Sequence, residues 1–173
     1  MRRRRRREQA AVNRVPMDVA AYVHRSRNGP CFICALISGV AGYEHEVVLD
    51  DGEHIAFLSR YPTVHGYLLV APRRHVEHVF RDLTPDEYGR LWSVVHRVAR
   101  ALESVVPSER TYVLSLGSQQ GNPHIHIHVV PLPPGTPYEQ QQYHALMAEN
   151  GVVQPTPAET AALGAALRAA LTD

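Results

Sequence analysis

The segment 124–130 constrains the fold more than any other, because it alternates histidine with branched apolar residues, His-Ile-His-Ile-His-Val-Val. A period of two is the pattern of a β-strand, whose successive side chains point to opposite faces. Ile125, Ile127 and Val129 would then be buried, and three imidazoles would share the other face. Near neutral pH an imidazole can be a nucleophile, an acid, a base or a metal ligand. The segment therefore predicts a strand that is anchored by burial on one face and carries chemistry on the other.

The size and charge of the chain favour one globular domain with a basic N-terminal arm. A chain of 173 residues with 45% hydrophobic residues can bury a sizeable core. All 18 cationic residues are arginine and six of them form the run 2–7, so without that run the net charge of +1 falls by six to −5. This asymmetry argues against a nucleic-acid-binding face spread over the fold. We interpret the run as a solvated charge cluster in preference to a phosphate- or membrane-binding arm.

Neither a secretory signal nor a membrane span is apparent in the sequence. Polar residues follow the basic start where a signal would need an apolar segment. The chain also has no run of about eighteen apolar residues. We therefore expect a cytoplasmic protein without a membrane partner, in which both cysteines are reduced.

Local patterns predict an α+β fold. Four strand-like segments accompany 124–130, at 46–49, 54–58, 66–71 and 111–116. Asp-Asp-Gly at 50–52 is a hairpin signal, so neighbouring strands should be antiparallel. Two capping boxes with proline at the first helical position predict helices over 85–102 and 157–171. We expect an antiparallel sheet of about five strands with a central helix and a C-terminal helix.

The chain divides into three predicted regions. Residues 1–28 are expected to form an Arg-rich, partly disordered arm, with a short helix around 15–24. Residues 29–145 form the domain that contains the alternating histidines, and 146–173 form a C-terminal helical extension. We expect the following histidines to be ordinary surface or partly buried side chains: His45, His54, His78 and His96.

Cys31 and Cys34 have the spacing of half a zinc site, and a closed structural site needs four ligands. His75, which follows a predicted strand, and His124 are the candidates for the other two. From the spacing alone, a pair of inert core thiols is equally favoured. A redox role is disfavoured because Gly39 ends the following segment early.

Taken in order, these segments resemble the histidine triad superfamily of nucleotide hydrolases and transferases, and in particular its zinc-containing bacterial hydrolases. The alternation at 124–130 is similar to the motif that gives the superfamily its name. The cysteine pair 31–34 and the segments 56–62 and 66–76 resemble further landmarks. The resemblance spans residues 29–131. It implies a histidine triad (HIT) fold and a homodimer, in which the helix that contains Trp92 and a neighbouring strand meet their symmetry mates.

The resemblance also implies a covalent mechanism. His126 would attack the α-phosphorus of a nucleoside phosphoramidate or dinucleoside polyphosphate, and water would resolve the nucleotidyl-histidine. His128 would donate hydrogen bonds to phosphate oxygens or to the leaving group. Gln120 would contact phosphate, with Ser118 and Asn122 as weaker candidates, because their loop has the short polar side chains that suit an anion.

In zinc-containing relatives the first histidine of the triad is a metal ligand. The resemblance therefore implies one structural zinc ion per chain, held by Cys31, Cys34, His75 and His124.

Two positions depart from the family pattern. Tyr67 stands where many members have a histidine. Ser59 stands where relatives often use Asp or Asn to hold the ribose hydroxyls, and it is our candidate for contacting that part of the substrate.

Two other functions stay open. One is a nucleotidyltransferase or phosphorylase of the same superfamily, although the transferases have glutamine where this chain has His128. The other is a non-catalytic, zinc-stabilised nucleotide-binding module, because a fold can persist without its activity.

Overall fold

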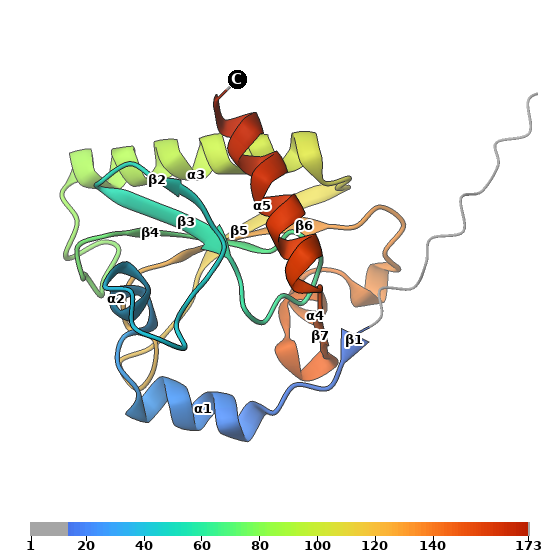
Figure 1. The fold of residues 1–173 in the computed structure, drawn as a ribbon, viewed down its shortest axis with the longest axis horizontal. Helices are drawn as coiled ribbons and strands as arrows, with labels where there is room; N and C mark the ends of the chain where they lie inside the picture. Colours follow the sequence, from blue (N-terminus) through green and yellow to red (C-terminus); the bar gives the residue numbers. More distant parts are fainter. Residues whose placement is uncertain (1–13, 173) are drawn as a thin grey trace, which may run out of the picture.

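The computed structural model describes residues 14–172, and the arginine run 2–7 lies outside them. Five strands form the central sheet in the order β2-β3-β4-β6-β5 (Figure 1). They are β2 (Val47–Asp50), β3 (His54–Leu58), β4 (Leu68–Pro72), β5 (Arg110–Ser115) and β6 (Ile127–Leu132). Every neighbouring pair is antiparallel. The predicted α+β fold is confirmed.

Two capped helices cover one face of the sheet, α3 (Pro85–Val105) and α5 (Pro157–Thr172). Thr84 caps α3 through a capping box, in which its side chain accepts from the Glu87 N–H and the Glu87 carboxylate accepts from the Thr84 N–H. The apolar face of α3 packs on the sheet in a core that also receives Leu167 of α5. Its members from the strands and α3 include Leu68, Val70, Ile127, Val129, Leu91, Val95, Val98 and Leu102. Both predicted helices are confirmed.

The short helix α2 (Phe32–Ile37) covers the opposite face of the sheet. Ile33 on α2 is fully buried in a second core with Phe57 and Leu69. Cys31 is the N-cap of this helix, and its sulfur accepts from the Cys34 N–H. The packing of α2 therefore fixes the cysteine pair against the sheet.

The histidine segment is a strand only over part of its predicted length, because β6 begins at Ile127 and His124 and His126 precede it. The N–H of Ile125 donates to the carbonyl of Val76, in the loop after β4. The segment just before β6 therefore pairs with a loop and not with a strand. The alternation nevertheless holds throughout. Ile125, Ile127 and Val129 all lie in the α3-side core. The histidines therefore face the α2 side, as predicted.

The described part of the N-terminal region joins the C-terminal region. The strand β1 (Arg14–Val15) pairs with β7 (Val152–Val153), and α1 (Val19–Asn28) follows. Between β6 and β7 lie the helix α4 (Tyr143–Leu146) and the 3-10 turns η1 (Tyr138–Gln140) and η2 (Ala148–Asn150). Residues 14–28 of the predicted arm thus contain a strand and a helix, and the three-region division stays a prediction. Within residues 14–172, no helix is long and apolar enough to cross a bilayer.

Candidate functional site

His126 lies at the centre of the candidate site, just before β6, and is only 4% exposed. Its Nδ1–H donates to the carbonyl oxygen of His124 at 2.7 Å. A carbonyl only accepts, so Nδ1 carries the proton. Burial also lowers the pKa of His126, which keeps the ring neutral near pH 7. A neutral ring with its proton on Nδ1 has a free lone pair on Nε2, which is the requirement for a nucleophile or a base.

His128 lies beside His126, with 4.8 Å between the ring centroids. Burial, and to a lesser degree the neighbouring His126, lowers the pKa of His128 to about 3, so this ring is also neutral near pH 7. Its Nδ1 lies 2.8 Å from the hydroxyl oxygen of Tyr67. Its Nε2 is buried and has no hydrogen-bond partner among residues 14–172. A buried ring nitrogen in this state is ready to bond to a ligand.

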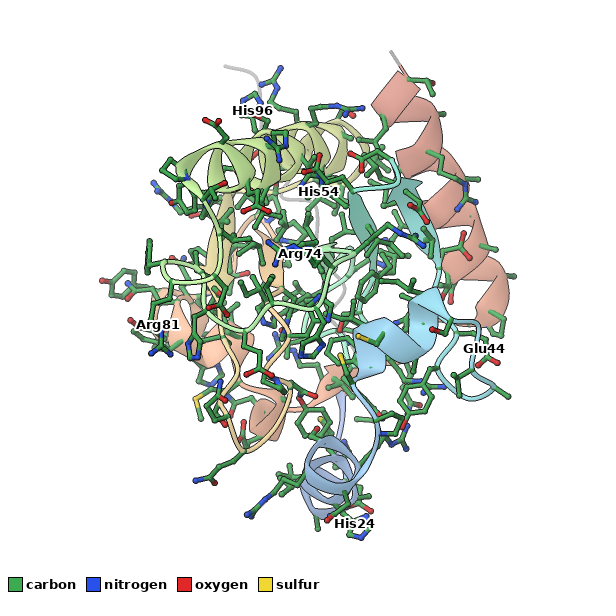
Figure 2. The ribbon with its side chains drawn as sticks, turned by 90° about the vertical axis from the view of Figure 1, so that its left-hand side faces the viewer. His24, Glu44, His54, Arg74, Arg81 and His96 are labelled. Carbon is green, nitrogen blue, oxygen red and sulfur yellow. The ribbon has the colours of Figure 1, made fainter. Side chains whose placement is uncertain are left out.

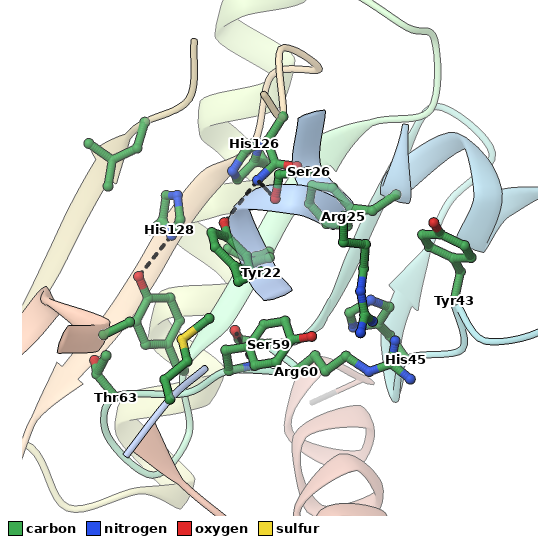
Figure 3. Close-up of a pocket in the computed structure, with 18 of the residues that line it drawn as sticks. Tyr22, Arg25, Ser26, Tyr43, His45, Ser59, Arg60, Thr63, His126 and His128 are labelled. Atoms are coloured by element: carbon green, nitrogen blue, oxygen red, sulfur yellow. Dashed lines mark hydrogen bonds between the residues drawn. The ribbon is translucent and has the colours of Figure 1, made fainter. Parts of the chain in front are cut away.

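A cavity of about 230 Å³ opens in front of His126 and His128, and we call it the histidine cavity (Figure 3). Phe32 forms part of its wall, with its ring edge-on to His126 at 5.4 Å. Two arginines line it, Arg25 from α1 and Arg60 from the segment after β3, and in the described chain no Asp or Glu lines it. The lining of the histidine cavity thus suits an anion.

The helix α1 forms one side of the histidine cavity and is tied to the opposite loop. Tyr22, Arg25 and Ser26 of α1 all line the cavity. The Asn122 side chain donates to the Tyr22 hydroxyl at 2.9 Å and to the Ser26 hydroxyl at 3.4 Å. Asn122 has a φ of 54°, a left-handed conformation that asparagine tolerates better than most residues. Asn122 therefore joins α1 to the loop that precedes the histidines.

The four residues predicted to contact phosphate or ribose divide into two pairs. Ser59 and Asn122 line the histidine cavity. Ser118 and Gln120 are not among its lining residues in the described chain. The hydroxyl of Ser118 accepts from the backbone N–H of Gln120 at 3.1 Å, within the turn itself. The phosphate-binding role of this second pair stays a prediction.

Sequence reasoning missed several residues of the histidine cavity. His45, expected to be an ordinary side chain, lines it beside Phe32, and burial lowers the pKa of His45. Arg60 was also not predicted, although it directly follows the candidate Ser59, because no local pattern marks it as a cavity residue. In contrast, His24 and His96 are exposed on the outer surfaces of α1 and α3 (Figure 2).

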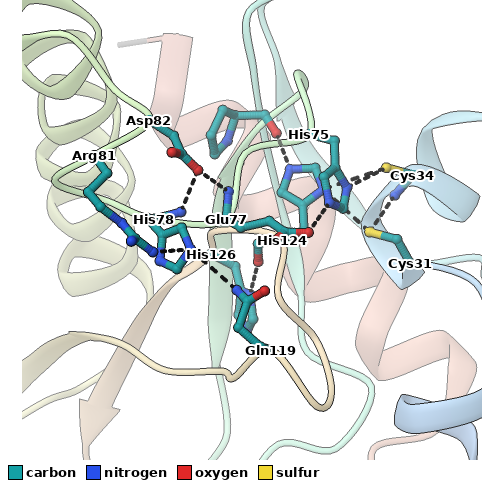
Figure 4. A network of polar contacts seen from close by, with 11 residues as sticks. Cys31, Cys34, His75, Glu77, His78, Arg81, Asp82, Gln119, His124 and His126 are labelled. Atoms are coloured by element: carbon teal, nitrogen blue, oxygen red, sulfur yellow. Dashed lines mark hydrogen bonds and ion pairs between the residues drawn. The ribbon is translucent and has the colours of Figure 1, made fainter.

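The four predicted metal ligands meet in one cluster, the Cys2His2 cluster, made of Cys31, Cys34, His75 and His124 (Figure 4). The two sulfur atoms and the two Nδ1 atoms all lie within 4.8 Å of one another. The cysteines come from the start of α2, His75 follows β4, and His124 precedes β6. Three segments that are distant in the sequence thus supply one set of donor atoms.

The donor atoms of the Cys2His2 cluster fit a tetrahedral metal. Zinc with Zn–S bonds of about 2.3 Å and Zn–N bonds of about 2.0 Å places sulfur and nitrogen ligands roughly 3.5 Å apart. The Sγ–Nδ1 distances are 3.4 Å for Cys31–His124, 3.3 Å for Cys34–His75 and 3.6 Å for Cys34–His124. Burial, with a further contribution from Cys31, raises the pKa of Cys34 to about 11, so a metal has to displace a proton from this thiol.

Hydrogen bonds hold both histidines of the Cys2His2 cluster in the ligating tautomer. The Nε2–H of His124 donates to the Pro72 carbonyl at 2.8 Å. The Nε2 of His75 lies 3.1 Å from a carboxylate oxygen of Glu77, which can only accept. Both Nδ1 lone pairs are therefore available to a metal, and such outer partners are typical of histidine ligands.

The chain is similar in sequence to known proteins. The family model for the HIT domain matches residues 42–134. An uncharacterised HIT-like protein of Mycobacterium tuberculosis is 30% identical over 105 residues, which are 59% of this chain and 71% of that protein. A bifunctional bis(5′-adenosyl)-triphosphatase/adenylylsulfatase of Arabidopsis thaliana is 38% identical over 79 residues, which are 44% of this chain and 43% of that protein.

The fold is also similar to that of a zinc-bound histidine triad family protein from Mycobacterium smegmatis. Its crystal structure has a TM-score of 0.64 at 25% identity, and the match covers 82% of this chain and 93% of that one. The family match spans more than half of this chain and contains all three alternating histidines. The chain therefore belongs to the HIT domain family, the histidine triad proteins.

Proposed function

We propose that this protein is a nucleotide hydrolase that cleaves a dinucleoside polyphosphate or a nucleoside phosphoramidate at its α-phosphate. The observation that carries the proposal is the state of His126, whose Nδ1–H is held by the His124 carbonyl while the ring faces the histidine cavity. A neutral imidazole in this tautomer presents a nucleophilic nitrogen to a bound phosphate.

The proposed reaction has two steps. In the first, Nε2 of His126 forms a bond to the α-phosphorus and the bond from phosphorus to the leaving group breaks. His128 relays a proton to that group, giving one from Nε2 and taking one up at Nδ1, so its ring stays neutral. In the second, water attacks the nucleotidyl-histidine and the phosphorus–nitrogen bond breaks. His128 takes a proton from the water at Nε2 and releases one from Nδ1, which restores the starting state. The products are a nucleoside monophosphate and the protonated leaving group.

The charge of the cavity lining supports an anionic substrate. Arg25 and Arg60 line the cavity, and no carboxylate does so within residues 14–172. An acidic side chain would repel a phosphate, whereas arginine can donate two parallel hydrogen bonds to it. The Arabidopsis relative, named as a bis(5′-adenosyl)-triphosphatase, supports the dinucleoside polyphosphate as one substrate class.

The test is intact-protein mass spectrometry after brief incubation with diadenosine polyphosphates and adenosine and guanosine phosphoramidates. We expect an increase of one nucleotide in the wild type and none in His126→Ala, whose turnover should fall at least about 10³-fold. The exposed His96 provides the matched control, and His96→Ala should form the adduct normally. Normal turnover by His126→Ala would refute the nucleophile. Dependence of the products on added phosphate would indicate a phosphorylase instead.

We propose further that the Cys2His2 cluster holds one structural zinc ion per chain. The sulfur–nitrogen distances and the zinc-bound Mycobacterium smegmatis relative support this. Four protein ligands leave no open position for a substrate, so the metal would supply rigidity and no catalysis. It would fix His124, whose carbonyl orients His126.

We also propose that the protein is a homodimer. β5 is an edge strand of the sheet, and Val113 and Leu116 at this edge are 37% and 54% exposed. An edge strand with apolar side chains is suited to pairing with a second copy, as the family resemblance implies. The native mass of the protein in solution tests this proposal.

A further inference from the structure

Tyr67 contacts Nδ1 of His128, whereas Nε2 of the same ring has no partner in the described chain. It directly precedes β4, is 6% exposed and belongs to the α2-side core. Its hydroxyl oxygen lies 2.8 Å from Nδ1 of His128, and the two rings are nearly perpendicular, at 79°. Figure 3 draws this bond as a dashed line that ends at the labelled His128, and both residues line the histidine cavity. Among residues 14–172 the Tyr67 hydroxyl makes no other hydrogen bond.

The direction of this hydrogen bond decides where the His128 proton lies. A neutral imidazole has one N–H, and a phenol can either donate or accept. If Nδ1–H donated to Tyr67, the hydroxyl proton of Tyr67 would be buried without an acceptor, which is costly. If Tyr67 donates to the Nδ1 lone pair, no proton of the pair is left unpaired except that on Nε2. Each arrangement thus leaves one proton of the pair without a protein partner, but the second leaves it on Nε2 of His128, a ring that lines the histidine cavity, where a bound ligand can accept it.

The protonation states of both side chains are compatible with the second arrangement. Burial raises the pKa of Tyr67, so the phenol keeps its proton. The His128 ring is neutral for the reason given above. Its Nε2, buried without a protein partner, belongs to a residue that lines the histidine cavity. A bound ligand is thus the one remaining partner for a proton on Nε2.

We infer that Tyr67 is a positioning residue, which donates its O–H to Nδ1 of His128 and so keeps the proton of that ring on Nε2. The inference rests on the proposed function for its consequence, which is delivery of that proton to the leaving group. As Nε2 gives up its proton, Nδ1 takes the hydroxyl proton of Tyr67, and the phenolate regains it when water is deprotonated in the second step. Proton delivery matters most for a basic leaving group such as an amine, and least for one that departs as a stable anion. Tyr67 would therefore favour substrates with basic leaving groups, such as phosphoramidates.

The direct test is ¹⁵N NMR of the protein labelled at its histidine ring nitrogens, with the His128 signals assigned by their loss in His128→Gln. We expect the wild type to carry its His128 proton on Nε2, with Nδ1 bare, and Tyr67→Phe to show a mixture of the two tautomers. A wild-type proton on Nδ1 would overturn the inference. This readout needs no substrate, so it separates failure of the inference from failure of the proposed function.

The kinetic test uses two substrates that differ in the leaving group, an N-alkyl phosphoramidate and a p-nitrophenyl ester, each made from AMP and from GMP. Tyr67→Phe should slow the amine probe at least about tenfold and change the p-nitrophenyl probe by less than about threefold. Tyr67→His, which restores the residue type of many relatives, should recover much of the loss. Tyr88→Phe, which removes a hydroxyl from α3, is the matched control. Equal slowing of both probes by Tyr67→Phe would overturn the role in proton delivery.

Discussion

At the scale of residues, His126 and His128 differ in what holds their Nδ1 atoms. A backbone carbonyl accepts from His126, and a phenol contacts His128. The carbonyl places the proton of His126 on Nδ1 and leaves Nε2 free, whereas the phenol can place the proton of His128 on Nε2. In the proposed reaction, two neighbouring and chemically identical side chains would thus take opposite roles, His126 as nucleophile and His128 as proton donor.

The buried histidines make stability depend on pH with a definite sign. Burial depresses the pKa of His128 from 6.5 to about 3, so the unfolded chain binds this proton more readily. The free energy of unfolding should therefore fall as the pH drops from 6.5 towards 3, by up to about 1.4 kcal/mol per pH unit for each such group. His128→Gln should make this loss shallower between pH 6.5 and 5, as measured by urea unfolding at several pH values. His96→Gln alters only an exposed side chain and should leave the slope unchanged, and equal slopes in all three proteins would refute the assignment.

At the scale of elements, α1 is the part of the site that differs most from expectation. It lies about 100 positions before the histidines, yet its side chains line the same cavity. The Asn122 bonds to Tyr22 and Ser26 and the pairing of β1 with β7 hold it there. The helix therefore contributes both a wall and a positive charge to the cavity.

Arg25 and Arg27 offer a matched pair on α1. Both are exposed arginines, but only Arg25 lines the histidine cavity. Arg25→Ala should weaken the binding of AMP or GMP about tenfold, because a charged hydrogen-bond donor to phosphate is lost. Arg27→Ala should bind as the wild type does. Calorimetric titration at low and high salt measures both variants, and equal affinities would show that α1 contributes no charge to the site.

At the scale of the whole molecule, the Cys2His2 cluster joins three segments on the α2 side of the sheet. These are the start of α2, the loop after β4 and the segment before β6. A structural metal adds its binding free energy to folding, because the unfolded chain has no preformed site. The same ion would also hold the backbone that orients His126.

Removal of the metal should therefore affect stability and catalysis together. The wild type should contain one zinc per chain by elemental analysis, and Cys34→Ser should contain little. Chelation should lower the melting temperature by more than about 5 °C and slow turnover. His78 lies next to Glu77 but outside the Cys2His2 cluster, so His78→Ala should keep its zinc. A chelated protein with unchanged melting temperature would rule out a structural role.

The sequence by itself determined the parts of this protein that depend on near neighbours. Both capping boxes start helices where expected, and the alternation at 124–130 places three histidines on one face, because caps and side-chain periodicity are local. The four members of the Cys2His2 cluster were all candidates from the sequence, but the cysteine spacing favoured inert thiols equally, and it was the family resemblance that implied a metal site. Tertiary structure decided the rest. It set where β6 begins, since the preceding residues pair with the loop after β4. It also brought together residues that are distant in sequence, as in the Tyr67–His128 bond and the contact of Asn122 with α1. Such contacts depend on which faces pack together once the sheet forms, and no local pattern encodes them.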